Sequence, residues 1–159
     1  MTRLRRESFL VGLGLLLICA VGAYLRLYNL RSNPGWYPDE GSVLNVAWNL
    51  WHGRFQFFAI GGSMLVSARA PLFPAILAAL FNVFGYDILV ARVVTAVAGL
   101  LTIPLMFFCL RRTLGVNGAL ASAAVYALLP LAVLYSRWSF EYSLLMPLSV
   151  VLLFASIFV

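Results

Sequence analysis

The chain lacks lysine and has few residues of the types that bind metals. All eleven basic side chains are arginines, five residues are acidic, and His52 is the single histidine among 159 residues. The two cysteines, Cys19 and Cys109, both lie inside apolar runs and have no spacing typical of a zinc site, a redox pair or a disulfide framework. We therefore expect no metal or redox centre, and we predict that both cysteines pack as small apolar residues.

Charge of either sign is scarce, and this scarcity excludes an ordinary water-soluble domain. Only 10% of the residues are charged, 64% are hydrophobic, and the mean hydropathy is +0.99. Soluble domains are about a quarter charged and about half apolar. A chain of this size cannot bury so much apolar surface from water. The composition therefore predicts an integral, multi-pass membrane protein in contact with membrane lipid.

The net charge of +6 does not come from a basic patch. The arginines separate apolar runs, as Arg3, Arg5 and Arg6 do before the first run and Arg111 and Arg112 do after a later one. Nucleic-acid binding needs a basic face or stripe, so we expect no nucleic-acid partner. Basic residues favour the cytoplasmic side of membrane spans, which places the amino terminus and Arg111–Arg112 in the cytoplasm.

The apolar runs predict an all-α, polytopic transmembrane helical bundle. We expect membrane crossings at 9–28, 90–110, 118–135 and 142–159. The run at 71–84 is about 21 Å long as a helix, too short for a hydrocarbon core of about 30 Å. We interpret it as an interfacial helix or a short span, and the second alternative inverts the topology of everything after it. The chain stops inside an apolar run, so we expect residues 1–159 to be the amino-terminal part of one larger transmembrane domain.

The stretch 31–69 is the long polar segment, and we predict an external loop there. Turn-forming residues bracket a helix expected from about residue 40 to 52, with apolar residues on one side. Aromatic residues crowd this region, which is typical of the membrane–water interface. The loop is therefore expected to carry interfacial amphipathic helices. Arg26, near the end of the first span, is expected to extend toward the outer interface.

Two adjacent carboxylates, Asp39 and Glu40, are the main candidates for chemistry. They follow the first span and begin the predicted interfacial helix. One interpretation is structural, because acids at a helix start cap it and interact favourably with its dipole. The other makes one carboxylate a general base whose pKa is tuned by burial and neighbouring charge. The two interpretations are compatible.

Arginines at the ends of apolar runs are candidates for lipid-phosphate binding. Arg69 and Arg92 each lie at such a boundary, where an arginine either extends to the interface or binds phosphate through its planar fork. Arg137 and Glu141 lie between the last two spans. They are either a helix-spaced pair in a plain hairpin or part of the same external cavity.

At these residues the sequence resembles a known family. The ordered motifs are Pro-Asp-Glu-Gly, Leu-Trp-His-Gly-Arg-Phe, Ala-Pro-Leu-Phe-Pro, Arg-Arg-Thr-Leu-Gly and Leu-Tyr-Ser-Arg-Trp-Ser-Phe-Glu-Tyr. The series is similar to the glycosyltransferase family 39 and aminoarabinose-transferase-like group of GT-C membrane glycosyltransferases, which includes the protein O-mannosyltransferases. The resemblance covers nearly all of this chain but only the amino-terminal part of a typical member.

The resemblance implies roles for individual residues. Asp39 matches the acid of the first external loop taken as catalytic base, and Glu40 matches the neighbour that organises the site. Arg92 matches a functionally important arginine, and Arg69 stands where aminoarabinose-type members have a lysine. Ala68 and Ala70 depart from that branch, so aminoarabinose transfer to lipid A is not specifically implied.

The implied reaction is inverting transfer of a sugar from a polyprenyl-phosphate donor to an acceptor hydroxyl (protein, lipid or glycan) on the external face. We expect no cofactor and no metal, and we expect the stretch 1–159 alone to be inactive. Two alternatives stay open from the residues. One is a non-catalytic membrane scaffold or assembly subunit, and the other is a transporter fragment, which should carry paired polar residues at mid-membrane.

Overall fold

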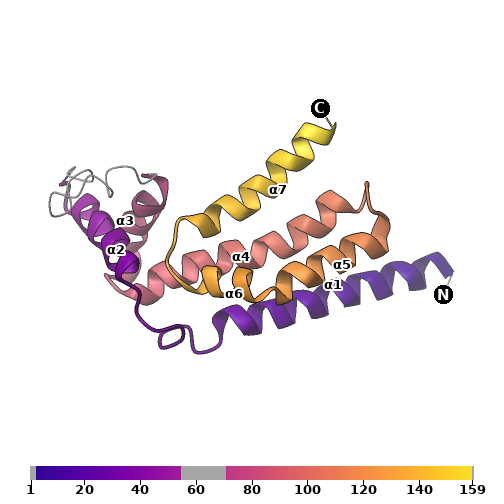
Figure 1. Ribbon diagram of the computed structural model, residues 1–159, viewed down its shortest axis with the longest axis horizontal. Helices are drawn as coiled ribbons and strands as arrows, with labels where there is room; N and C mark the ends of the chain where they lie inside the picture. Colours follow the sequence, from indigo (N-terminus) through magenta and orange to yellow (C-terminus); the bar gives the residue numbers. More distant parts are fainter. Residues whose placement is uncertain (1–2, 55–70, 159) are drawn as a thin grey trace.

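The computed structural model describes residues 3–54 and 71–158, and these residues form seven helices with no strand among them (Figure 1). The helices are α1 (Arg3–Leu27), α2 (Pro38–Trp51), α3 (Leu72–Phe84), α4 (Ile88–Leu110), α5 (Gly115–Leu128), α6 (Pro130–Arg137) and α7 (Tyr142–Phe158). The predicted all-α helical membrane fold is confirmed.

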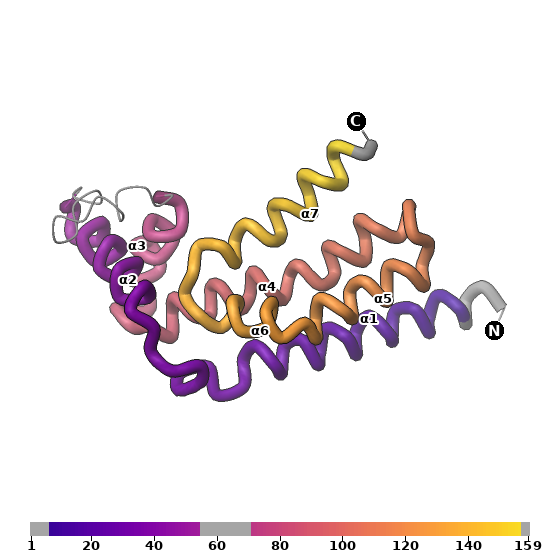
Figure 2. Tube along the Cα trace, in the orientation of Figure 1, coloured from indigo at the N-terminus to yellow at the C-terminus, as the bar shows by residue number. Residues whose placement is uncertain are grey.

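The long helices run back and forth between two ends of the molecule (Figures 1 and 2). The amino-terminal end of α1 and the connection from α4 to α5 lie at one end. The connections from α1 to α2 and from α6 to α7 lie at the other end, together with α2 and α3. Because α2 follows α1 and α7 follows α6, the polar segments that carry the candidate site residues gather at this second end.

Two helices are long and apolar enough to cross a membrane by themselves. Glu7–Leu27 has 21 residues and a mean hydropathy of 2.3, and Ile88–Leu110 has 23 residues and a mean hydropathy of 2.4. At a rise of about 1.5 Å per residue they are about 30 Å long or more, which matches a hydrocarbon core. The chain is therefore a membrane protein, and its orientation across the bilayer stays a prediction.

The predicted crossing at 118–135 is a broken helix. It consists of α5 and α6, which together pass the same test but bend by 55° at Leu129. Pro130 explains the break, because a proline has no N–H to donate and disfavours helical backbone at the residue before it. The helices α3 and α7 are apolar but shorter, so the expected status of 71–84 and 142–159 stays a prediction.

Small residues allow the spanning helices to pack closely. Ala119, Ala123 and Ala127 form a buried row on α5, each at most 1% exposed, packed with Ile103 and Phe107 of α4. Small residues at four-residue spacing are a common way for membrane helices to approach one another. Hydrophobic burial gives little drive between helices in lipid, so this close packing is what holds α1, α4 and α5 together.

A second apolar cluster fixes α2 at the end of α4. Val43 and Ala47 of α2 pack with Phe73, Leu77 and Phe81 of α3, and all five are at most 1% exposed. Ala91 of α4 belongs to the same cluster. The predicted apolar side of the helix from about residue 40 is thus the side that α3 covers, and this packing holds α2 beside α4.

Candidate functional site

The two candidate carboxylates lie in the first turn of α2. Tyr37 is the N-cap residue and Pro38 the first helical residue, where a missing N–H is tolerated. The helix therefore begins two residues earlier than the sequence predicts, and Asp39 is not the N-cap. Glu40 reaches back, so that the Tyr37 amide donates to its Oε2 at 3.3 Å. This is the glutamate half of a capping box.

Glu40 is fully buried and is held by Arg92 and Ser139. Arg92 donates from Nε to Oε1 at 3.0 Å and from Nη2 to Oε2 at 2.7 Å, a bidentate pair. The amide and the hydroxyl of Ser139 donate to Oε1 at 3.0 and 2.9 Å. Burial alone raises the pKa of Glu40, but these hydrogen bonds and the Arg92 charge outweigh it and lower the pKa below its usual range.

Arg92 also binds the chain segment that joins α1 to α2. It is 2% exposed, and besides Glu40 its guanidinium donates to the carbonyl oxygens of Leu30, Arg31, Pro34 and Gly35. These contacts occupy all five guanidinium N–H groups. In this structure Arg92 therefore positions Glu40 and the segment before it.

Arg137 holds the same segment from the other side. It is 6% exposed and donates to the carbonyl oxygens of Leu25, Tyr28 and Asn33. The neighbouring Trp138 indole donates to Gly35 O at 3.2 Å. Cations at the end of a helix satisfy its last carbonyls. Two buried arginines thus fix the path by which α1 leads to the carboxylates of α2.

Asp39 points to a different environment from that of Glu40. It lines a cavity of about 120 Å³ whose other residues are Tyr37, Tyr135, Phe140, Glu141 and Tyr142. A cavity of this size holds a few water molecules or part of a polar ligand. The structure therefore brings Asp39 and Glu141, which are about a hundred residues apart, to one site at the end of the bundle. The roles expected for them from sequence stay predictions.

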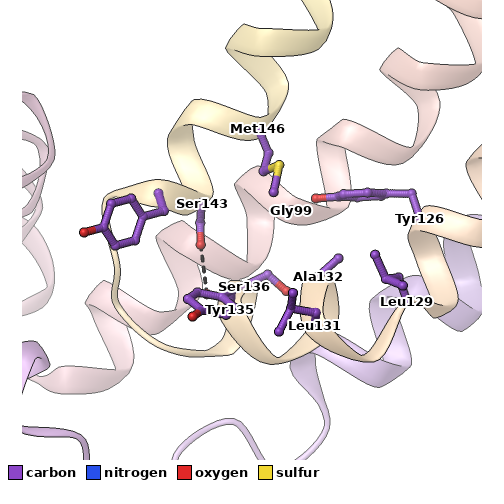
Figure 3. A pocket seen from close by; sticks show the side chains of 10 residues that line it. Gly99, Tyr126, Leu129, Leu131, Ala132, Tyr135, Ser136, Ser143 and Met146 are labelled. Carbon is purple, nitrogen blue, oxygen red and sulfur yellow. Dashed lines mark hydrogen bonds between the residues drawn. The ribbon is translucent and has the colours of Figure 1, made fainter.

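Figure 3 shows a larger pocket, of about 350 Å³. Its lining residues are Gly99, Tyr126, Leu129, Leu131, Ala132, Tyr135, Ser136, Tyr142, Ser143 and Met146. Tyr135 and Tyr142 line both spaces. The Asp39 cavity therefore lies next to a mostly apolar pocket between α4, α5, α6 and α7.

Sequence reasoning missed Ser139 and misplaced Arg26. Ser139 lies in the Ser-Arg-Trp-Ser motif, and only the fold shows that it reaches Glu40. Arg26 does not extend to the interface, because it is fully buried and donates to the carbonyl oxygens of Gly22, Tyr126 and Ala127. Arg69 lies outside the described residues, so its expected contact with lipid phosphate stays a prediction.

These features define a class of protein: a membrane-embedded helical bundle with a carboxylate-lined cavity at one end, beside an apolar pocket. Residues 68–159 match the family model of the dolichyl-phosphate-mannose-protein mannosyltransferases. This match covers more than half of the chain, which therefore belongs to that family and is a GT-C membrane glycosyltransferase. No curated protein and no solved structure gives a significant match. Asp39 and Glu40 precede the matched residues.

Proposed function

We propose that the protein transfers a sugar from a polyprenyl-phosphate donor to an acceptor hydroxyl, at the end of the bundle that carries Asp39. Family membership supports a lipid-linked donor and a membrane setting. The observation that carries the proposal is the position of Asp39 in a cavity that shares Tyr135 and Tyr142 with an adjacent apolar pocket. Such a junction can hold a polar sugar phosphate beside its lipid chain.

In the proposed step, Asp39 acts as general base. Its carboxylate takes the proton of the acceptor hydroxyl while the hydroxyl oxygen forms a bond to the anomeric carbon of the sugar. The bond from that carbon to the phosphate oxygen breaks, and its electrons leave with the polyprenyl phosphate. Attack opposite the leaving phosphate inverts the anomeric carbon. The second acid of the cavity, Glu141, is placed to bind sugar or acceptor hydroxyls.

Glu40, Arg92 and Arg137 are positioning residues in this proposal. Their side chains are buried and bind one another or the backbone around α2, so they set the place of Asp39 without touching a substrate. The sequence predicts that Arg92, together with Arg69, binds the lipid phosphate; because Arg92 is buried against Glu40 and backbone carbonyls, the proposal keeps this role for Arg69. We also propose that the reaction needs no metal and no cofactor. The site is proposed to lie on the external face, because the arginines at the opposite end of the bundle favour the cytoplasmic side.

The test is a donor panel with membranes that contain the protein. Radiolabelled sugars are supplied either as polyprenyl phosphates or as nucleotide diphosphates, and the anomeric configuration of the product is determined by NMR. We expect transfer from a polyprenyl-phosphate sugar with inversion, and none from nucleotide sugars. Transfer from a nucleotide sugar would overturn the donor assignment. Absence of transfer from every donor would favour a scaffold function for this member of the family.

A further inference from the structure

The bend between α5 and α6 leaves backbone carbonyls without their helical donors. The helical hydrogen bonds end with the Leu129 amide, which donates to Val125 O at 2.8 Å, and resume with the Val133 amide, which donates to Leu129 O at 3.0 Å. A straight helix would satisfy Tyr126 O with the amide of residue 130, but Pro130 has no N–H. Inside a membrane no water supplies the missing donor, so these carbonyls need another partner.

Arg26 of α1 supplies donors to two of these carbonyls. Its Nη1 donates to Ala127 O at 3.0 Å, and its Nη2 donates to Tyr126 O at 3.3 Å. The guanidinium also lies 5.3 Å from the centroid of the Tyr126 ring, within cation–π range. The planar fork of an arginine suits two neighbouring acceptors better than the single ammonium of a lysine does. Arg26 therefore takes the place of amides that the bend removes.

The space around this guanidinium is made by two glycines. Arg26 is fully buried, and within the described residues its hydrogen-bond acceptors are backbone carbonyls rather than carboxylates. A Cβ atom added to Gly22 of α1 would lie 3.6 Å from Nη1, and one added to Gly99 of α4 would lie 3.2 Å from Nε. A charged side chain inside a membrane span is costly. Its burial among bare backbone of α1 and α4 indicates that the contacts with α5 offset this cost.

The direction of α6 determines where several site residues lie. Tyr135 of α6 lines the candidate catalytic cavity, and Arg137, its last residue, donates to backbone carbonyls of the segment before α2. Ser139 follows and donates to Glu40. Figure 1 shows α6 beside α1 and α4, at the end of the bundle where α2 begins. Arg26 is not among the residues that line the cavity, so it acts on the site through α6.

We propose that Arg26 is a positioning residue, which stabilises the bend between α5 and α6 and so holds α6 where its residues complete the candidate site. The inference rests on the proposed function, because it names a residue outside the cavity on which sugar transfer depends. Without the guanidinium, the carbonyls at the end of α5 lose their donors and α6 is free to change direction. Tyr135 and Ser139 then leave the places that the cavity and Glu40 require.

A double-mutant cycle with Pro130 tests the link between Arg26 and the bend. Pro130→Ala supplies an amide at residue 130 that can donate to Tyr126 O. In Arg26→Met this amide replaces a lost donor, whereas in the native protein Arg26 already satisfies the carbonyl. Pro130→Ala should therefore raise the thermal midpoint in nanodiscs more in the Arg26→Met background, by about 3 °C or more. Equal effects in the two backgrounds would show that Arg26 and the bend are independent, and would overturn the inference.

Hydrogen exchange and transfer rates test whether the loss of Arg26 reaches the site. In Arg26→Met we expect faster exchange at 138–141, where the Ser139 amide binds Glu40. The transfer rate at saturating donor should fall by about tenfold to a hundredfold. Arg26→Lys keeps a cationic donor and should lie between Arg26→Met and the native protein. Arg111→Met, which removes an exposed arginine at the opposite end of the bundle, is the control and should change neither. Native exchange in Arg26→Met would overturn the positioning role.

These readouts separate the role of Arg26 from the reaction. Thermal midpoints and hydrogen exchange require no sugar transfer, so they test the bend even in a protein that transfers no sugar. Coupling between Arg26 and Pro130 with faster exchange at 138–141, but without transfer by the native protein, would sustain the role of Arg26 and reject the proposed function. Transfer that depends on Asp39 and is equally fast in Arg26→Met and the native protein would sustain the function and reject the positioning role.

Discussion

Arg92 of α4 holds Glu40 of α2 in a buried, bidentate ion pair, with Nη2 and Oε2 2.7 Å apart. Glu40 is fully buried and Arg92 is 2% exposed, so the neighbouring Asp39 is the acid of the pair that lines a cavity. Two adjacent carboxylates thus have separate environments. The pair with Arg92 fixes the first turn of α2, and the preceding residue, Asp39, lines the cavity where we propose that substrate binds.

Removing Arg92 should strongly destabilise the protein. In Arg92→Met, Glu40 stays buried without its cation, and breaking a buried pair in this way costs about 3–5 kcal/mol. Thermal unfolding in detergent or nanodiscs measures the change. Arg31→Met is the control. The Arg31 and Asp87 side chains of that ion pair are 64% and 36% exposed, and exposed ion pairs contribute about 1 kcal/mol or less to stability.

Adding Glu40→Gln to Arg92→Met should restore part of the lost stability, because it removes the uncompensated charge. Sugar transfer should stay low in the double variant, since the first turn of α2 is no longer fixed. Equal stabilities of Arg92→Met and Arg31→Met would show that the buried pair does not hold the site together.

Stability should fall in acid partly through Glu40. Its pKa in the folded protein is below the ordinary value of 4.5, so the folded state binds this proton less readily than the unfolded state. The contribution to stability is therefore fully present above the unfolded pKa and is lost as the pH falls through the folded pKa. Unfolding of the native protein and of Glu40→Gln between about pH 6 and about pH 3 should show a shallower loss in the variant. Parallel curves would contradict the assigned pKa shift.

Gly99 should tolerate no side chain. A Cβ there would lie 2.6 Å from Ser136 Cβ and 3.2 Å from Arg26 Nε, so α4 and α6 would have to separate. We expect Gly99→Ala to destabilise the protein by about 1–3 kcal/mol, the usual cost of overpacking. At Gly14 no atom lies within 4 Å of an added Cβ. Gly14→Ala should therefore leave stability unchanged or raise it by up to about 1 kcal/mol. Thermal unfolding of both variants measures the change in stability. Equal changes for Gly99→Ala and Gly14→Ala would contradict the close contact at Gly99.

Composition and periodicity predicted the helical membrane fold because apolar runs report directly on lipid contact. The break at Pro130 and the earlier start of α2 at Pro38 depend on two prolines, whose local effect competes with the apolar pattern. The run at 118–135 alone does not reveal that its two halves bend by 55°.

The candidate site could be predicted only in part. Asp39, Glu40, Arg92, Arg137 and Glu141 all lie at one end of the bundle, as the order of polar segments suggested. Their separate roles follow from tertiary contacts between residues 52 to 112 positions apart, which no local pattern encodes. For the same reason the pocket behind Tyr135 and the inward direction of Arg26 were not foreseen.

The most direct measurement is the rate of sugar transfer by Asp39→Asn, compared with Asp87→Asn at equal expression. Asp87 caps α4 through the Leu89 amide at 2.8 Å, and asparagine can cap equally well, so the control changes an acid without changing a helix. If Asp39 is the general base, its variant should lose about 100- to 10,000-fold in rate while Asp87→Asn stays near the native rate. Transfer by Asp39→Asn at the native rate would contradict the account.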